Sequence, residues 1–150
     1  MLEAFSRVDG IIINDHEARL LAGGNVISCG KEILDYGPKF CVIKKGEHGS
    51  ILFFSDGTVI PFPAFPLENV VDPTGAGDSF AGGFLGFLSS TDLSKLSNLK
   101  QAMAWGTVMG SIAVESLATR SLELADFAAA KTRYRAYREF LRLEDSFESE

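Results

Sequence analysis

Cysteine and histidine are scarce in this sequence, and their scarcity excludes several kinds of site. Only Cys29 and Cys41 occur, without a C-x-x-C pair and with neither of the two histidines beside them. A disulfide framework or a zinc site needs more of these residues at defined spacings. Two buried thiols in a reducing compartment account for both cysteines, so we expect a cytoplasmic protein.

Long apolar runs and basic clusters are also missing. No stretch approaches the ~20 consecutive apolar residues of a membrane helix, and the first residues lack the basic and apolar regions of a secretion signal. The 14 Lys and Arg residues are outnumbered by 20 Asp and Glu residues, and they are spread along the chain except toward the C-terminus. We therefore expect neither a membrane nor a nucleic acid as a partner, but a small-molecule ligand.

The chain has 150 residues, which is enough for one domain with a hydrophobic core, and the period of its hydrophobic residues changes in an orderly way along it. Residues 10–14 read as a buried strand, and the helical spacing of 15–23 ends at Gly23-Gly24. A weak helix over 31–36 precedes a second strand within 40–46. Residues 50–62 form a hairpin around Asp56-Gly57, a pair that supplies the positive φ of a tight turn.

Helices dominate the rest of the chain, over 79–88, 99–117 and 124–143. The fold class is therefore α/β, a mixed β-sheet with packed helices. The last helix is amphipathic and carries several arginines, to which we assign no function. Residues 144–150 are acidic and without periodicity, so a disordered tail is expected there.

The stretch DPTGAGDS, residues 72–79, follows an apolar run and opens a glycine-rich helix. It is not a Walker A loop, because no Lys follows the last glycine, and it lacks the third glycine of a dinucleotide fingerprint. The peptide N–H groups of residues 75–78 lie at a helix start, which favours a bound anion. Asp78 beside a phosphoryl group would accept the proton of an attacking hydroxyl. Alternatively, Asp78 only caps the helix.

Two other polar stretches end predicted strands. Asn14 and Glu17 follow the first strand, and Lys44, Gly46 and Gly49 follow the second. Ligand crevices of open α/β sheets lie outside the carboxyl ends of the strands, so the three stretches point to one site. The alternatives are a capping box at residues 14–17 and an ordinary charged turn at 44–49.

Small residues recur along the helix at 99–117, with Gly106 and Gly110 among them. Glycine inside a helix costs ~1 kcal/mol relative to alanine, so something approaches this helix closely. We expect either a tightly packed neighbouring helix or a flat ligand ring.

The motif DPTGAGDSFAGGF resembles the C-terminal signature of the PfkB, or ribokinase-like, carbohydrate kinases, and N-x-x-E and K-x-G-x-x-G precede it in the family's order. The resemblance implies a three-layer α/β/α fold, ATP-dependent phosphorylation of a sugar or nucleoside hydroxyl, Mg²⁺, and in some members K⁺. It covers the C-terminal half of the family's length. Residues 1–150 would thus be the nucleotide-binding half of a kinase domain.

The same resemblance implies a role for each motif. Asp78 would be the general base, and Gly75, Ala76 and Gly77 the anion hole. Asn14 and Glu17 would organise Mg²⁺ and phosphates through water, and Lys44, Gly46 and Gly49 would face the nucleotide. Asp72 would lie near a monovalent cation, and Gly106 and Gly110 near the adenine.

A half-site has consequences for activity and assembly. Positioning of donor and acceptor can supply ~7 to 11 kcal/mol of a barrier, so little turnover is expected from half a site. The exposed edge of a cut sheet favours a homo-oligomer. Two other classes stay open, a non-catalytic nucleotide-binding or assembly module and a dinucleotide-binding oxidoreductase domain.

Overall fold

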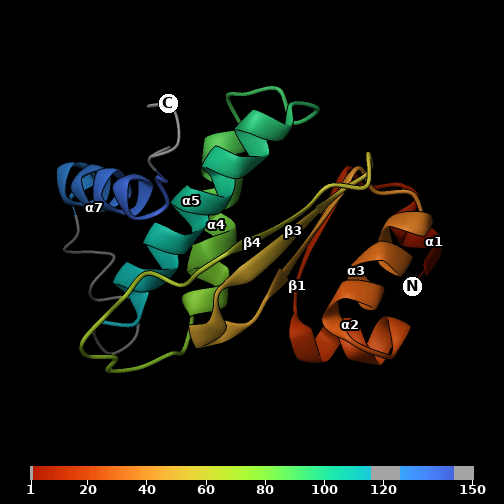
Figure 1. Ribbon diagram of the computed structural model, residues 1–150, viewed down its shortest axis with the longest axis horizontal. Helices are drawn as coiled ribbons and strands as arrows, with labels where there is room; N and C mark the ends of the chain where they lie inside the picture. The colour runs from red at the N-terminus through yellow and green to blue at the C-terminus, as the bar shows by residue number, and fades with distance from the viewer. Residues whose placement is uncertain (1, 116–125, 144–150) are drawn as a thin grey trace, which may run out of the picture.

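The computed structural model describes residues 2–115 and 126–143, which form one four-stranded sheet between two layers of helices (Figure 1). In chain order, the elements are α1 (Leu2–Phe5), β1 (Gly10–Asn14), α2 (Asp15–Ala22), α3 (Val26–Asp35), β2 (Phe40–Lys44), the 3₁₀ turn η1 (Gly46–His48), β3 (Ser50–Phe54), β4 (Val59–Phe62), α4 (Ala76–Leu88), α5 (Leu96–Ala113) and α7 (Phe127–Phe140). The α/β class predicted from the sequence is confirmed.

The sheet order is β1-β2-β3-β4, with β1 and β2 parallel and the remaining pairs antiparallel. The predicted strand at residues 10–14, the helix after it and the hairpin are all present. At the hairpin turn, Gly57 has φ +91° and the carboxylate of Asp56 accepts the N–H of Thr58 at 2.8 Å. Asp56 and Gly57 therefore close the turn as their residue types predict.

Successive side chains along the strands point to opposite faces of the sheet, so a hydrophobic core forms on each face. Phe40 and Val42 of β2 face α4, α5 and α7, whereas Cys41 and Ile43 face α2 and α3. The phenol of Tyr137 in α7 reaches the strand layer and donates to the carbonyl of Pro63 at 2.6 Å. The helices thus cover both faces, in three layers.

Three predicted helices have different bounds in the structure. The helix predicted at 31–36 is α3, which begins at Val26 because the side chain of Asn25 accepts the N–H groups of Ile27 and Ser28. The helix predicted from residue 79 begins at Ala76, since Gly75 adopts φ +80° and serves as the N-cap. The prediction at 99–117 is α5, which starts one turn earlier and ends at Ala113.

The last predicted helix, 124–143, corresponds to α7, where Asp126 is the N-cap and its carboxylate accepts the N–H of Ala129 at 2.6 Å. Residues 116–117, 124–125 and the predicted tail at 144–150 lie outside the described residues. Across the described ranges, no helix combines the length and the apolar character that crossing a membrane requires.

Candidate active site

The three polar stretches that the sequence assigned to one site do lie together. Because β1 and β2 are parallel and Asn14 is the register partner of Lys44, both strands end at the same edge. The ammonium of Lys44 then spans to the first turn of α4, where Nζ donates to the carbonyl of Gly77 at 3.2 Å. The strand ends and the glycine-rich turn are therefore joined by a direct hydrogen bond.

The N-terminus of α4 offers backbone donors to an anion. The N–H of Ala76 donates to the carbonyl of Pro73 at 3.2 Å, so this donor is already engaged inside the turn. Within the described part of the chain, the N–H groups of Gly75, Gly77 and Asp78 have no acceptor. Free donors at the positive end of a helix dipole favour a negatively charged ligand.

Asp78 is the third residue of α4, and its side chain is exposed. The alternative that Asp78 is the N-cap is wrong, because Gly75 takes that position and no side chain makes a capping bond there. No hydrogen bond to another described residue engages the carboxylate. The acid is therefore available to a ligand beside the free backbone donors.

Asn14 and Glu17 form the capping box that their spacing predicts at the start of α2. Oδ1 of Asn14 accepts the N–H of Glu17 at 2.7 Å, and the Glu17 carboxylate accepts the N–H of Asn14 at 2.8 Å. The box holds both side chains at the strand edge, with Glu17 exposed. Among the described residues, the second carboxylate oxygen of Glu17 and the NH₂ group of Asn14 stay without a hydrogen bond.

The remaining candidates have structural explanations of their own. Gly46 and Gly49 have φ +56° and +82°, and the backbone at Phe62 and Ala64 leaves no room for a side chain at Gly49. Asp72 accepts the N–H of Thr74 at 2.9 Å, which shapes the loop before α4. The expected nucleotide and cation contacts of these residues stay predictions.

Gly106 and Gly110 lie against α4. A Cβ at Gly106 would come within 3.0 Å of the Phe80 ring, and one at Gly110 within 3.3 Å of the carbonyl of Ala76. Of the two explanations that the sequence left open, the close approach of a neighbouring helix is therefore present. The expected contact of both glycines with an adenine stays a prediction.

One buried polar group near these residues was missed from the sequence. Ser50, the first residue of β3, is 3% exposed, and its hydroxyl has no hydrogen-bond partner among the described residues. Serine at the start of a strand is common, and no spacing in the sequence marks it. Only the packing in three dimensions shows that its hydroxyl lacks a hydrogen-bond partner in the described part of the chain.

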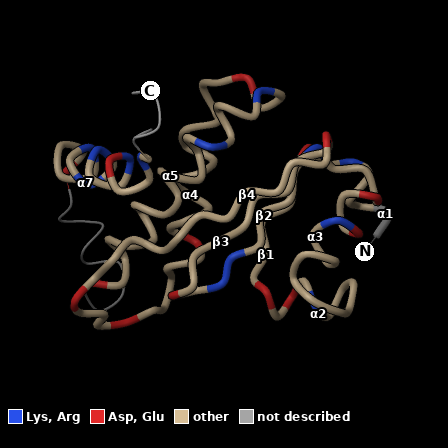
Figure 2. The backbone as a smooth tube through the Cα atoms, viewed as in Figure 1, with Lys and Arg blue, Asp and Glu red and all other residues tan. Residues whose placement is uncertain are grey.

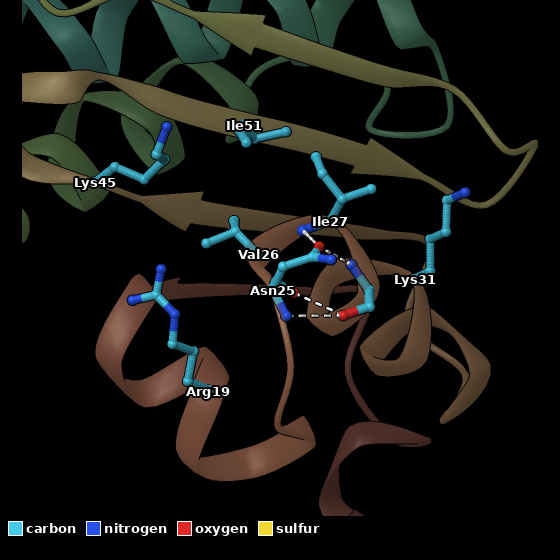
Figure 3. Close-up of a pocket in the computed structure, with 8 residues that line it drawn as sticks. Arg19, Asn25, Val26, Ile27, Lys31, Lys45 and Ile51 are labelled. Atoms are coloured by element: carbon cyan, nitrogen blue, oxygen red, sulfur yellow. Dashed lines mark hydrogen bonds between the residues drawn. The ribbon is translucent and has the colours of Figure 1, made fainter.

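A hollow of about 710 Å³ lies on the other face of the sheet, at the N-terminus of α3 (Figure 3). Arg19, Lys31 and Lys45 line it, but the Asn25 side chain already accepts the N–H groups at that helix start. Arg19 also pairs with Asp15 at 2.8 Å. The donors of this helix terminus are thus largely used within the protein.

Neither the cysteines nor the basic helix supplies a further reactive group. Both thiols are free and buried, and burial raises the pKa of Cys41 to about 12, so this thiol stays protonated. Lys and Arg recur along α7 (Figure 2), where Arg133 pairs with Glu115 at 2.9 Å and ties α7 to the end of α5. The site at the α4 N-terminus is therefore the strongest candidate.

Comparison with known proteins identifies a family for this chain. The profile of the pfkB family carbohydrate kinases matches residues 1–125. A cytidine kinase of Thermococcus kodakarensis is 43% identical over 86 residues, which is 55% of this chain and 30% of that protein.

Two solved structures share the fold. The aminoimidazole riboside kinase of Salmonella enterica, solved with aminoimidazole riboside and an ATP analogue, superposes with a TM-score of 0.77 at 26% identity and covers 89% of this chain. The ribokinase of Thermotoga maritima gives a TM-score of 0.74 at 26% identity and covers 93%. The chain spans only 44% and 45% of these two proteins, so its fold is a partial ribokinase-like one.

Proposed function

Because the chain belongs to the pfkB family of carbohydrate kinases, we propose that it carries the ATP-binding part and the catalytic base of a sugar or nucleoside kinase. The observation that carries the proposal is the exposed carboxylate of Asp78 beside the free N–H groups of Gly75 and Gly77, at the edge where Asn14 and Lys44 also lie. Backbone donors would hold the phosphoryl group while the acid faces the acceptor. This arrangement fits phosphoryl transfer to a hydroxyl.

In the proposed reaction, Asp78 accepts the proton of the acceptor hydroxyl as its oxygen bonds to the γ-phosphorus of ATP. The bond from that phosphorus to the bridging oxygen of ADP breaks, and ADP leaves. The N–H groups at the α4 N-terminus and the Lys44 ammonium stabilise charge on the transferring group. Gly46 and Gly49 shape the loop beside the nucleotide, with Gly106 and Gly110 nearer the adenine.

The donor set fits a magnesium ion held mainly by nucleotide phosphates and water. The described residues contain no group of three or more His, Cys, Asp and Glu side chains that would form a protein cage for a metal. The capping box fixes Asn14 and Glu17 at the strand edge, and we assign them to contacts with the water shell of Mg²⁺. The ion would neutralise phosphate charge; a K⁺ ion near Asp72 is a further part of the proposal.

The proposal includes location and assembly. The free, buried thiols fit a cytoplasmic location, where thiols stay reduced. Self-association is proposed through the edge of β1 that pairs with no described strand. This strand carries three isoleucines and neither charge nor proline, whereas the opposite edge strand carries the exposed Pro61. Because the chain spans less than half of its structural relatives, we propose little turnover from this chain alone.

Ligand-dependent melting tests the proposal. ATP with Mg²⁺ at about 100 times its Kd should stabilise the fold by ~2.7 kcal/mol, which raises Tm by roughly 5–10 °C for a chain of this size. NAD should leave Tm unchanged. Stabilisation by NAD alone would indicate a dinucleotide-binding domain, and no effect of either ligand would indicate an assembly module without a nucleotide site.

A further inference from the structure

Ser50 has a buried hydroxyl that the fold leaves without a partner. Its residue is 3% exposed, and Oγ neither donates to nor accepts from any group in the described ranges. A buried polar group without a hydrogen bond destabilises a fold, so native structures satisfy most such groups. The exception at Ser50 calls for a specific explanation.

The register of the sheet places this hydroxyl beside Lys44. Ser50 and Lys44 are directly opposed in the antiparallel β2–β3 pair, so their side chains lie on the same face with Cβ atoms ~4.5–5.5 Å apart. That face is the one toward α4, because Lys44 Nζ donates to the carbonyl of Gly77. The hydroxyl and the ammonium therefore share the space below the first turn of α4.

Lys44 is itself incompletely satisfied. An ammonium has three donors, yet the hydrogen bond to Gly77 is the only one that it makes within the described residues, and no carboxylate among them lies within ion-pair distance. The ammonium also comes close to the backbone, since a Cβ at residue 77 would lie 2.7 Å from Nζ. A half-buried cation with one neutral acceptor favours an anion nearby.

We infer that Ser50 is a positioning residue of the phosphate site and acts through Lys44. When a phosphate oxygen of a bound nucleotide accepts one hydrogen of the ammonium, the Ser50 hydroxyl accepts a second and the Gly77 carbonyl keeps the third. All three donors are then used, and the buried hydroxyl gains its missing partner. The inference rests on the proposed function, because it requires a nucleotide phosphate at the α4 N-terminus.

The test is a double-mutant cycle on the affinity for ADP with Mg²⁺, measured by titration calorimetry. Ser50→Ala should weaken ADP binding roughly 10–100-fold, which corresponds to one lost hydrogen bond to a charged group. Ser50→Thr, which keeps a hydroxyl at the same position, should restore most of the affinity. In a Lys44→Met background, Ser50→Ala should have no further effect, because the group through which it acts is gone.

Two controls separate positioning from packing. Ser50→Ala should melt no earlier than the parent chain, since it removes an unpaired hydroxyl. Ser111→Ala, which removes a buried hydroxyl that already donates to the carbonyl of Val108, should leave ADP affinity unchanged. An equal loss of affinity in both Lys44 backgrounds, or no rescue by threonine, would overturn the inference while the nucleotide site stands. If the parent chain binds no ADP, the proposed function fails first, and the inference fails with it.

Discussion

At the scale of single residues, Asp78 decides whether the proposed chemistry is right. Asp78→Asn removes the proton acceptor and its charge but keeps the shape of an exposed side chain that bonds to no described residue, so the free energy of unfolding should fall by no more than the about 0.3–1 kcal/mol of a carboxylate at a helix N-terminus. Turnover should fall by roughly 10²- to 10⁴-fold, as expected for loss of a general base. The measurement is steady-state kinetics in a fusion with the part of a family kinase that this chain does not span, with ATP affinity followed separately.

Asp78→Ala provides the comparison. Because Gly75 is the N-cap of α4, this variant loses no cap and should lose only the interaction of a carboxylate with the helix dipole, about 0.3–1 kcal/mol. Both variants should therefore be folded and slow. Nearly full turnover of the Asn variant would mean that Asp78 is not the base.

Sequence reasoning reached Asp78 and Lys44 because each follows from a local rule. A glycine-rich helix start favours anions, and the ends of parallel strands gather at one edge. It did not reach Ser50, because the burial of this residue and the missing hydrogen-bond partner of its hydroxyl follow only from the packed structure. It also left open the alternative that Asp78 caps the helix, because it placed the helix start at residue 79. The structure contradicts that alternative: Gly75, with φ +80°, is the N-cap, and α4 begins at Ala76, three residues before the predicted start.

At the scale of helices and strands, the glycines of α4 allow a matched test of helix packing. A Cβ at Gly83 would lie 2.6 Å from Met109 Cγ and 2.7 Å from the carbonyl of Trp105, whereas one at Gly82 would meet nothing within 4 Å. Gly83→Ala should therefore destabilise the fold by about 1–3 kcal/mol through overpacking against α5.

Gly82→Ala is the control on the same helix, because it changes the neighbouring residue on a face of α4 where an added Cβ contacts no described residue. It should stabilise the fold by ~0.5–1 kcal/mol, because alanine has the higher helix propensity and the position is open. Urea unfolding of both variants measures the difference. Equal effects would show that α4 and α5 do not pack as closely as described.

The elements that were predicted well have strong local sequence signals. The start of α3 was not predicted, and its residues show why. Its first turn is capped by Asn25 and Ser28 rather than by the usual acidic partner, and Gly30 interrupts the helical pattern. The structure explains this glycine, since a Cβ there would collide with the ring of Phe53 in β3. A contact between distant segments thus lowered the local helix signal and hid the start of the helix.

At the scale of the whole molecule, the sheet ends on β1, a parallel strand with no partner on its outer side among the described residues. Ile12 and Ile13 of this strand lie on opposite faces and are only partly buried. The ring of Phe84 in α4 contacts Phe40, the register partner of Gly10 in β1, and the exposed Leu85 follows Phe84 on the flank of α4 away from α5. An unprotected strand edge with apolar neighbours favours pairing with another chain.

We therefore expect the chain to self-associate, with a weight-average mass that rises across a concentration series in sedimentation equilibrium. Leu85→Lys adds a charge at a position that is 55% exposed, so it should leave the fold intact and weaken association about tenfold by placing like charges in the contact. Phe127→Lys is the matched control, since Phe127 is 67% exposed on α7 and does not belong to the β1 side. If Phe127→Lys weakens association and Leu85→Lys does not, the contact lies on α7. A monomer at every concentration would mean that the β1 edge, although free, does not pair with a second copy.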